Sequence, residues 1–331
     1  MKNKLIARFQ RWFIGALAVG ALVYLGGTIW AGFDEVHAAL ARFDWRYLAP
    51  LAGLTLVNYG LRFAKWRYFL GRLGVHMPLR EDLWTFLAGL SMAISPGKAG
   101  ELLKPYVVRE RTGAPMATTI PALISERLTD GIAMLIIAAF GVTTYAADQL
   151  GLLVALGVGV AVGLVVVSNA KLTLGVIGVM ERVPLLARLT PRLRMMAEAT
   201  HVCLAPTPLL LSVSLSIVAW LAECIAYWQT FSGFGVEVSP EASIYIYASS
   251  TILGAPSPGG LGVTDGAMTV GAMTILGVER GVALPAALIA RTVTLWMGVG
   301  MGAIALLRVS AMLGGDIDLD RPAPPAPGAV E

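Results

Sequence analysis

Three ionisable residues inside a long apolar run are the first part of this sequence that could do chemistry. Glu126, Arg127 and Asp130 lie within residues 117–147, which otherwise carry no charge. An ionisable side chain at the centre of a bilayer costs about 2.5–3.5 kcal/mol on insertion scales, so it usually faces protein or water. Glu126 and Asp130 share a helical face, and Arg127 can pair with Asp130 three residues later. The cluster predicts either a polar binding site or a self-neutralising ion pair.

Two more apolar runs each contain a single charge. Glu223 lies within residues 208–231 and Arg291 within residues 281–307. Arg291 has no acid in its own run, so Glu223 and Asp265 are its candidate partners. Arginine presents a planar fork of donors that matches phosphate oxygens. Arg291 is therefore expected either to anchor a phosphate or to fix helix packing through a buried pair.

The pattern S-P-G-x-x-G occurs twice and would break a helix each time. Proline lacks the amide donor and glycine weakens a helix further. The turn residues are Ser95, Pro96, Gly97 and Gly100 in the first copy, and Ser257, Pro258, Gly259, Gly260 and Gly262 in the second. The glycines are expected to serve backbone geometry. Lys98 and Glu101 at the first break are expected either to contact a ligand or to snorkel at the interface.

The composition predicts a membrane helix bundle, and the spans of that bundle would position the two helix breaks. Hydrophobic residues make up 56% of the 331 positions and charged residues 14%, whereas a soluble domain carries about 25% charged residues. A span needs about 20 apolar residues. Six spans are expected, the second with Arg62 snorkelling near its end: 12–33, 47–64, 117–147, 149–170, 208–231 and 281–307.

The remaining apolar segments, 83–111 and 242–276, are interpreted as re-entrant hairpins that turn at S-P-G-x-x-G. In the alternative, each apolar run is a full span and the motif is a surface loop. The positive-inside rule favours the hairpins, because they leave the basic loops on one side, including Lys65 in a loop over 65–82 and the linker 171–206. Both termini are then cytoplasmic. The domain covers 1–313, followed by a disordered, Pro-rich acidic tail at 314–331.

The two halves of the chain resemble each other beyond the motif. "PALISERLTD" at 121–130 follows the first copy, and "PAALIARTVT" at 285–294 follows the second. Under the hairpin topology the two copies enter from opposite sides of the membrane. The expected fold is an all-α polytopic bundle with inverted repeats at about 47–170 and 207–313, a design in which broken helices meet at a midplane site.

The stretches "SPGKAGELLKPYVV", "ISERLTDG" and "APSPGGLGVTDG" also resemble a known family. They are similar to the membrane domain of lysylphosphatidylglycerol synthases and their stand-alone flippase-like relatives, over roughly residues 10–310. The resemblance implies a flippase-like fold and leaves the lipid unnamed. The bifunctional members carry a soluble aminoacyltransferase domain after the membrane part. Here a Pro-rich tail follows, so synthase activity is not implied.

The expected function is movement of a polar or anionic lipid between leaflets of the cytoplasmic membrane. Two alternatives stay open: a non-catalytic lipid-binding partner of a glycosyltransferase or lipid-modifying enzyme, and an ion-coupled solute transporter. No H-E-x-x-H, P-loop or G-x-S-x-G motif occurs, so we expect no enzymatic activity and no cofactor. Anionic or phosphate-bearing membrane lipids are the expected partners, and nucleic acid is not.

Overall fold

The computed structural model describes residues 4–95, 100–147, 150–169, 173, 175, 177–179 and 189–314, and these residues form helices and their connections. Pro96, Gly97 and Lys98 of the first motif lie outside the described residues. So do most of the tail predicted at 314–331 and much of the first half of the linker predicted at 171–206. An all-helical bundle agrees with the fold class expected from composition.

The long helices correspond to the predicted spans. They are α1 (Lys4–Ala31), α3 (Leu48–Arg72), α6 (Met116–Tyr145), α7 (Leu150–Ser168), α11 (Pro206–Gly233) and a continuous stretch made of α14 (Arg280–Arg291), the π-helical turn η6 (Thr292–Trp296) and α15 (Met297–Met312). Among the described residues, three helices are long and apolar enough to cross a membrane: Met116–Tyr145, Pro206–Gly233 and Arg280–Met312. Shorter apolar stretches occur at Ala18–Ala31 and Leu150–Val166.

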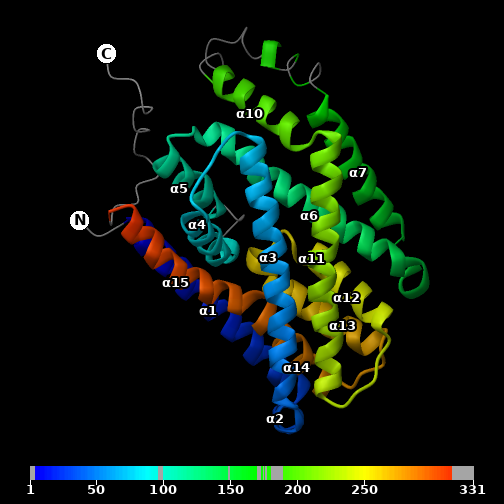
Figure 1. The fold of residues 1–331 in the computed structure, drawn as a ribbon. Coiled ribbons are helices and arrows are strands. Elements are labelled where there is room, and N and C mark those ends of the chain that lie inside the picture. The colour runs from blue at the N-terminus through cyan, green and yellow to red at the C-terminus, as the bar shows by residue number, and fades with distance from the viewer. Residues whose placement is uncertain are drawn as a thin grey trace, which may run out of the picture.

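Two shorter helices and one turn connect or flank the long helices. Helix α2 (Phe33–Arg42) and the short turn η1 (Trp45–Tyr47) connect α1 to α3. Helix α10 (Thr190–Cys203) occupies the second half of the predicted linker and packs against α6. Helices α3 and α11 lie side by side and run in opposite directions (Figure 1), so they form the central axis of the described bundle.

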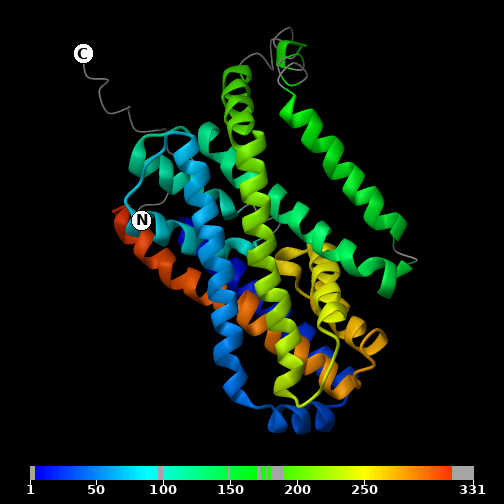
Figure 2. The ribbon, with the colours of Figure 1, turned by 45° about the vertical axis from the view of Figure 1, so that its right-hand side comes forward.

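Each S-P-G-x-x-G motif separates two short helices that pack against one another. The first segment contains α4 (Leu79–Ser91), the turn η2 (Met92–Ile94) and α5 (Leu103–Thr112). The second contains α12 (Pro240–Gly254), the turn η5 (Pro258–Gly260) and α13 (Val263–Thr274). The predicted helix breaks are therefore present. In Figure 2 the first segment lies in the upper left part of the bundle and the second lies in its lower right part.

Local sequence signals explain where these short helices begin and turn. At the start of α12 the hydroxyl of Ser239 accepts a hydrogen bond from the Ala242 amide at 3.1 Å, and Pro240 occupies a position that needs no amide donor. At the first break the Gly100 amide donates to the Ser95 hydroxyl at 2.9 Å. At the second break Gly260 has a φ of 74°, which glycine adopts without steric cost.

The tips of the two broken segments meet in the interior. Turn η2 contacts turn η5, and Ile94, Leu261 and Val299 form one buried apolar cluster. Each segment also packs on a long helix of the other half: α4 lies against α15, and α12 lies against α6. This exchange of partners brings both breaks to the centre of the bundle.

The contact between α4 and α15 depends on a glycine. A side chain on Gly302 would overlap the backbone nitrogen of Ser91 and come within 2.7 Å of the Leu87 carbonyl oxygen. Gly302→Ala should therefore destabilise the protein by about 1–3 kcal/mol, the usual cost of overpacking. Thermal unfolding of the purified protein measures the effect. Gly300→Ala on the same helix is the matched control, because a Cβ there meets no atom within 4 Å. An equal melting temperature for the two variants would contradict the close approach.

Candidate functional site

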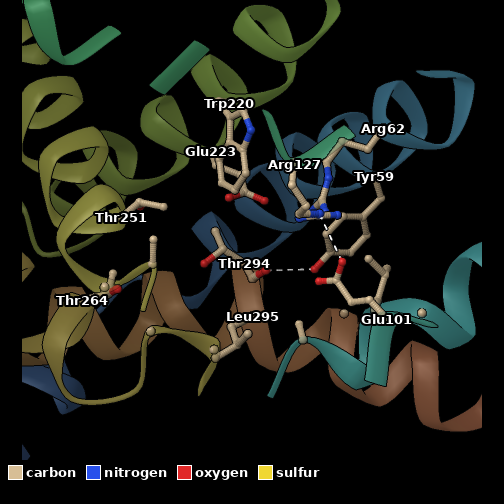
Figure 3. Close-up of a pocket in the computed structure, with 18 of the residues that line it drawn as sticks. Tyr59, Arg62, Glu101, Arg127, Trp220, Glu223, Thr251, Thr264, Thr294 and Leu295 are labelled. Atoms are coloured by element: carbon tan, nitrogen blue, oxygen red, sulfur yellow. Dashed lines mark hydrogen bonds and ion pairs between the residues drawn. The ribbon is translucent and has the colours of Figure 1, made fainter. Parts of the chain in front are cut away.

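A cavity of about 130 Å³ lies where the two broken segments meet (Figure 3). One water needs about 10–15 Å³ on this measure, so the cavity has room for several. Its walls come from both halves of the chain. Its charged lining residues are Arg62, Glu101, Lys104, Glu126, Arg127, Glu223 and Arg291.

Glu126 is the centre of the charge network on the first half. Its side chain is completely buried, and its two carboxylate oxygens accept from Lys104 at 2.6 Å and from Arg127 at 2.8 Å. Lys104 reaches it from α5 and lies 4.3 Å from the Trp66 ring centroid, which favours a cation there. The network therefore ties the segment after the first break to α6.

Asp130 holds the other end of this network. Its Oδ1 atom lies 2.5 Å from the Lys65 ammonium on α3 and accepts from the Ser216 hydroxyl on α11 at 3.0 Å. Lys65 is itself completely buried. The ion pair joins α3 to α6, and Ser216 brings in α11 through hydrogen bonds.

Arg127 is the most exposed member of the network at the cavity. Its guanidinium lies 3.2 Å from Glu101, 2.8 Å from Glu126 and 3.6 Å from Asp130, so the pair expected from i, i+3 spacing is present. About 30% of its side chain is exposed, whereas Glu126 is inaccessible. Four cations share this network with three carboxylates: Arg62, Lys65, Lys104 and Arg127 with Glu101, Glu126 and Asp130.

Arg291 forms the corresponding pair on the second half. Its Nε atom donates to Asp265 at 3.0 Å, and its Nη2 atom donates to the Gly259 carbonyl in the second break. The other oxygen of Asp265 accepts from the Gly262 amide at 2.7 Å. Asp265 is thus the partner of Arg291, one of the two that the sequence offered, and the pair holds the turn against α14.

Glu223 has no ion-pair partner among the described residues. It lines the cavity from α11 and accepts a hydrogen bond from the Tyr247 hydroxyl at 2.7 Å. Its side chain is buried, so a neutral donor is its polar contact in an environment that penalises charge. This acid differs from every carboxylate of the first network.

The structure gathers the described ionisable residues of the predicted site around or beside the cavity, as one network, one pair and one single acid. Glu101, Glu126, Arg127 and Asp130 belong to one network, Asp265 and Arg291 form a pair, and Glu223 lies alone. Lys98 lies outside the described residues. Whether any of these side chains contacts a substrate stays a prediction.

Two predictions about α3 are wrong. Arg62 was expected to snorkel near the end of a span and Lys65 to lie in a cytoplasmic loop. Helix α3 instead continues to Arg72, so both side chains lie mid-helix and are buried in the interior. The sequence carries a signal for this placement: Arg62 and Lys65 are three residues apart, so they share one helical face, and the two cations can pair with the acids Glu126 and Asp130 on one face of 117–147. Lys104 and Trp220, also at the cavity, were not singled out.

The chemistry available at the cavity is recognition of charge and hydrogen bonding. Within the described part of the chain, no group of three or more His, Cys, Asp or Glu side chains could hold a metal ion. Cys203 and Cys224 are buried free thiols on different helices. The cavity residues instead supply guanidinium, ammonium, indole and hydroxyl donors beside carboxylates.

Comparison with known proteins agrees with this architecture. Residues 13–302 match the model of the lysylphosphatidylglycerol synthase TM region. A UPF0104 membrane protein of Methanothermobacter thermautotrophicus (strain Delta H) is 27% identical over 315 residues, covering 89% of this chain and 92% of the relative. A second UPF0104 membrane protein of that organism is 22% identical over 325 residues, covering 88% of this chain and 93% of the relative.

The match spans both broken segments and every helix that lines the cavity. It includes the stretches that carry the resemblance in the sequence, at 95–108, 124–131 and 255–266. The chain is therefore a membrane protein that belongs to the family of the lysylphosphatidylglycerol synthase TM region.

Proposed function

We propose that this protein moves a polar or anionic lipid between the leaflets of the cytoplasmic membrane. The observation that carries the proposal is the charged cavity where two broken helical segments, one from each half of the chain, meet. A headgroup would occupy the cavity while the acyl chains stay in the bilayer. Ionisable residues inside membrane bundles usually mark such substrate paths.

The contacts between helices support an inverted repeat. The packing of α4 on α15 corresponds to that of α12 on α6, and the packing of α3 on α6 corresponds to that of α11 on α14. Pro121 and Pro285 lie inside α6 and α14, and each precedes its cavity arginine by six residues. Broken helices in inverted repeats commonly meet at a midplane site. We propose that α4–α5 and α12–α13 are re-entrant hairpins entered from opposite sides.

The charge of the cavity supports an anionic headgroup. The network around Glu126 and Asp130 contains one more cation than carboxylates, and Arg291 is balanced by Asp265. Glu223 also lines the cavity, so the excess of one cation exists when Glu223 is protonated. A negative group would compensate this excess in a low-dielectric interior. We propose no enzymatic step, because movement of a headgroup through the cavity makes and breaks no covalent bond.

Reconstitution tests the function directly. The purified full chain is placed in vesicles that contain a fluorescent phosphatidylglycerol, and a membrane-impermeant reductant quenches the label in the outer leaflet. Lipid movement predicts that the fluorescence protected inside is lost at a rate that rises with the amount of protein. Lipid binding without any increase in that rate would favour a binding partner of a lipid-modifying enzyme. Uptake of a solute instead would favour the solute transporter.

The topology gives a separate prediction. Single cysteines at Arg111 and Glu279, in a background with Cys203 and Cys224 replaced, should react from opposite sides of the membrane. Both positions are exposed, Arg111 near the end of α5 and Glu279 at the start of α14. An impermeant thiol reagent outside intact cells should label position 279 and spare position 111. Both background cysteines are buried, so their replacement removes little signal.

Permeabilised cells supply the control, because both positions must then react. Labelling of position 111 from outside intact cells would contradict the opposed hairpins and the cytoplasmic placement of the loop after α5. Equal labelling of the two positions would contradict the inverted repeat even if the protein moves lipid.

A further inference from the structure

Arg62 is a buried cation whose donors are left unused. It is 8% exposed and lines the cavity from α3. Its closest carboxylate oxygens are Glu126 Oε1 at 3.7 Å and Asp130 Oδ2 at 3.9 Å, beyond hydrogen-bond distance. Its Nε atom is buried and has no hydrogen-bond partner in the described structure. A guanidinium has five N–H donors, so this arrangement leaves a strong anion-binding group available.

Trp220 provides a second unused donor at the same wall. Its ring lies 5.6 Å from the Arg62 guanidinium carbon, so the two side chains are in cation–π contact. Its indole Nε1 atom is buried and finds no acceptor among the described residues. Figure 3 shows Trp220 and Arg62 beside the cavity, with Glu223 directly below Trp220. Buried polar groups are normally hydrogen-bonded to protein, water or ligand, so two donors without a protein acceptor in one cavity mark a place where an acceptor can bind.

The chemistry of these groups selects the ligand. Both are donors. Of the two carboxylate oxygens that face Arg62, Glu126 Oε1 already accepts from Arg127, and Asp130 Oδ2 has no hydrogen-bond partner in the described structure and lies 3.9 Å from Arg62 Nε, too far for a direct bond. A guanidinium fork and an indole N–H match the oxygens of a phosphate group. A cationic ligand would meet the excess of cations in the adjacent network. We propose that Arg62 and Trp220 form a phosphate-binding subsite, and that Glu223 takes up a proton when the phosphate binds.

Glu223 belongs to this subsite by position. It follows Trp220 by three residues on α11, lies on the same face and lines the same cavity. It forms no ion pair with a described residue. The charged or titratable groups that face it from the helices packed around α11 are Tyr59 and Arg62 on α3, Asp130 on α6, Tyr247 on α12 and Arg291 on α14.

Proton uptake follows from the sign of the interaction. A phosphate bound at Arg62 brings negative charge next to Glu223, which disfavours the ionised carboxylate. Binding of the anion and protonation of Glu223 therefore favour each other, and the coupling is reciprocal. Lowering the pH should strengthen binding, by up to about tenfold per pH unit for one linked proton. This inference rests on the proposed function for its setting, but its test measures binding and not movement.

The experiment titrates the purified full chain in detergent with dioctanoyl phosphatidylglycerol and follows the heat of binding. A phosphodiester keeps its charge over the pH range used, so any pH dependence belongs to the protein. Trp220→Phe keeps an aromatic ring for Arg62 and removes only the donor. It should weaken binding about tenfold or more, as loss of a hydrogen bond to a charged group does. Arg62→Gln should weaken it at least as much.

Trp45→Phe and Arg46→Gln are the matched controls, since both residues are exposed on η1 away from the cavity. They should bind like the parent protein. A second titration uses inorganic phosphate. Stronger binding of the lipid assigns the subsite to a headgroup, and comparable binding of inorganic phosphate assigns it to the free ion. Binding of neither, or parent-like binding by folded Trp220→Phe, would overturn the phosphate subsite.

Glu223→Gln tests proton uptake independently of phosphate binding. This variant should bind phosphatidylglycerol with an affinity that no longer changes between acidic and mildly alkaline buffer. A pH dependence equal to that of the parent protein would overturn the role of Glu223. If the parent protein moves lipid in vesicles but Trp220→Phe and Arg62→Gln bind lipid as the parent does, the phosphate subsite is wrong and the proposed function stands. If the variants bind as predicted but the parent protein does not move lipid, the subsite stands and the proposed function is wrong.

Discussion

Replacing Arg127 with glutamine is expected to slow lipid movement by about tenfold or more while the bundle stays folded. Arg127 is the most exposed of the first network's cations that line the cavity, with about 30% of its side chain exposed. Loss of one charge-assisted contact to a headgroup corresponds to about 1.5–3 kcal/mol. Glu126 keeps Lys104 and Asp130 keeps Lys65, so most of the network stays paired. Glu101 loses its ion pair with Arg127, so some thermal stability should be lost as well. The vesicle assay measures the rate, and thermal unfolding measures the fold.

Lys104→Met is the contrasting variant in the same network. Lys104 is buried, so its loss removes the closest partner of Glu126, and breaking a buried pair costs about 3–5 kcal/mol. This variant should lose thermal stability first. Parent-like transport by a folded Arg127→Gln would remove Arg127 from the substrate path. Unfolding of Arg127→Gln to the same extent as Lys104→Met would assign it to the structural pair instead.

The helix breaks were predictable because their causes are local. Proline and glycine change backbone geometry whatever surrounds them, and the turns at Ser95 and Ser257 occur where the motif places them. The end of α3 was not predictable in this way. Charges at Arg62 and Lys65 indicate the edge of a span when the segment is considered alone, although the helix continues to Arg72. Acids on another helix compensate both side chains, and a single segment carries no information about them.

The contacts of the candidate site are likewise of two kinds, those indicated by local spacing and those that depend on packing between helices. Arg127 and Asp130 are close in sequence, so helical spacing alone indicated their pair. The partners of Lys65 and Lys104 lie 65 and 22 residues away, and only packing of α3 and α5 on α6 brings them together. Trp220 looks like an ordinary apolar residue of a span until the structure places its N–H in a cavity without an acceptor. An apolar residue such as Trp220 becomes a candidate binding residue only when the structure shows which groups surround its polar atom.

Replacing Arg291 with glutamine is expected to destabilise the protein by about 3–5 kcal/mol. Arg291 and Asp265 are both buried and form an ion pair at 3.0 Å, so the substitution leaves Asp265 without its cation. It also removes the donor to the Gly259 carbonyl, which holds the second break against α14. Chemical or thermal unfolding in detergent measures the loss. The matched single variant Asp265→Asn should be destabilised as well, because it leaves Arg291 unpaired.

The double variant Arg291→Gln and Asp265→Asn decides what the pair is for. Removing both charges should recover most of the stability lost in the single variants, since no unpaired buried charge remains and the side-chain amide oxygen at position 265 can still accept from the Gly262 amide. About 1 kcal/mol should stay lost with the bond to Gly259. If the pair is purely structural, lipid movement returns together with stability. If a headgroup phosphate passes along Arg291, the double variant folds but moves lipid slowly. A double variant that is no more stable than Arg291→Gln would contradict the pair itself, because the two substitutions would then act independently.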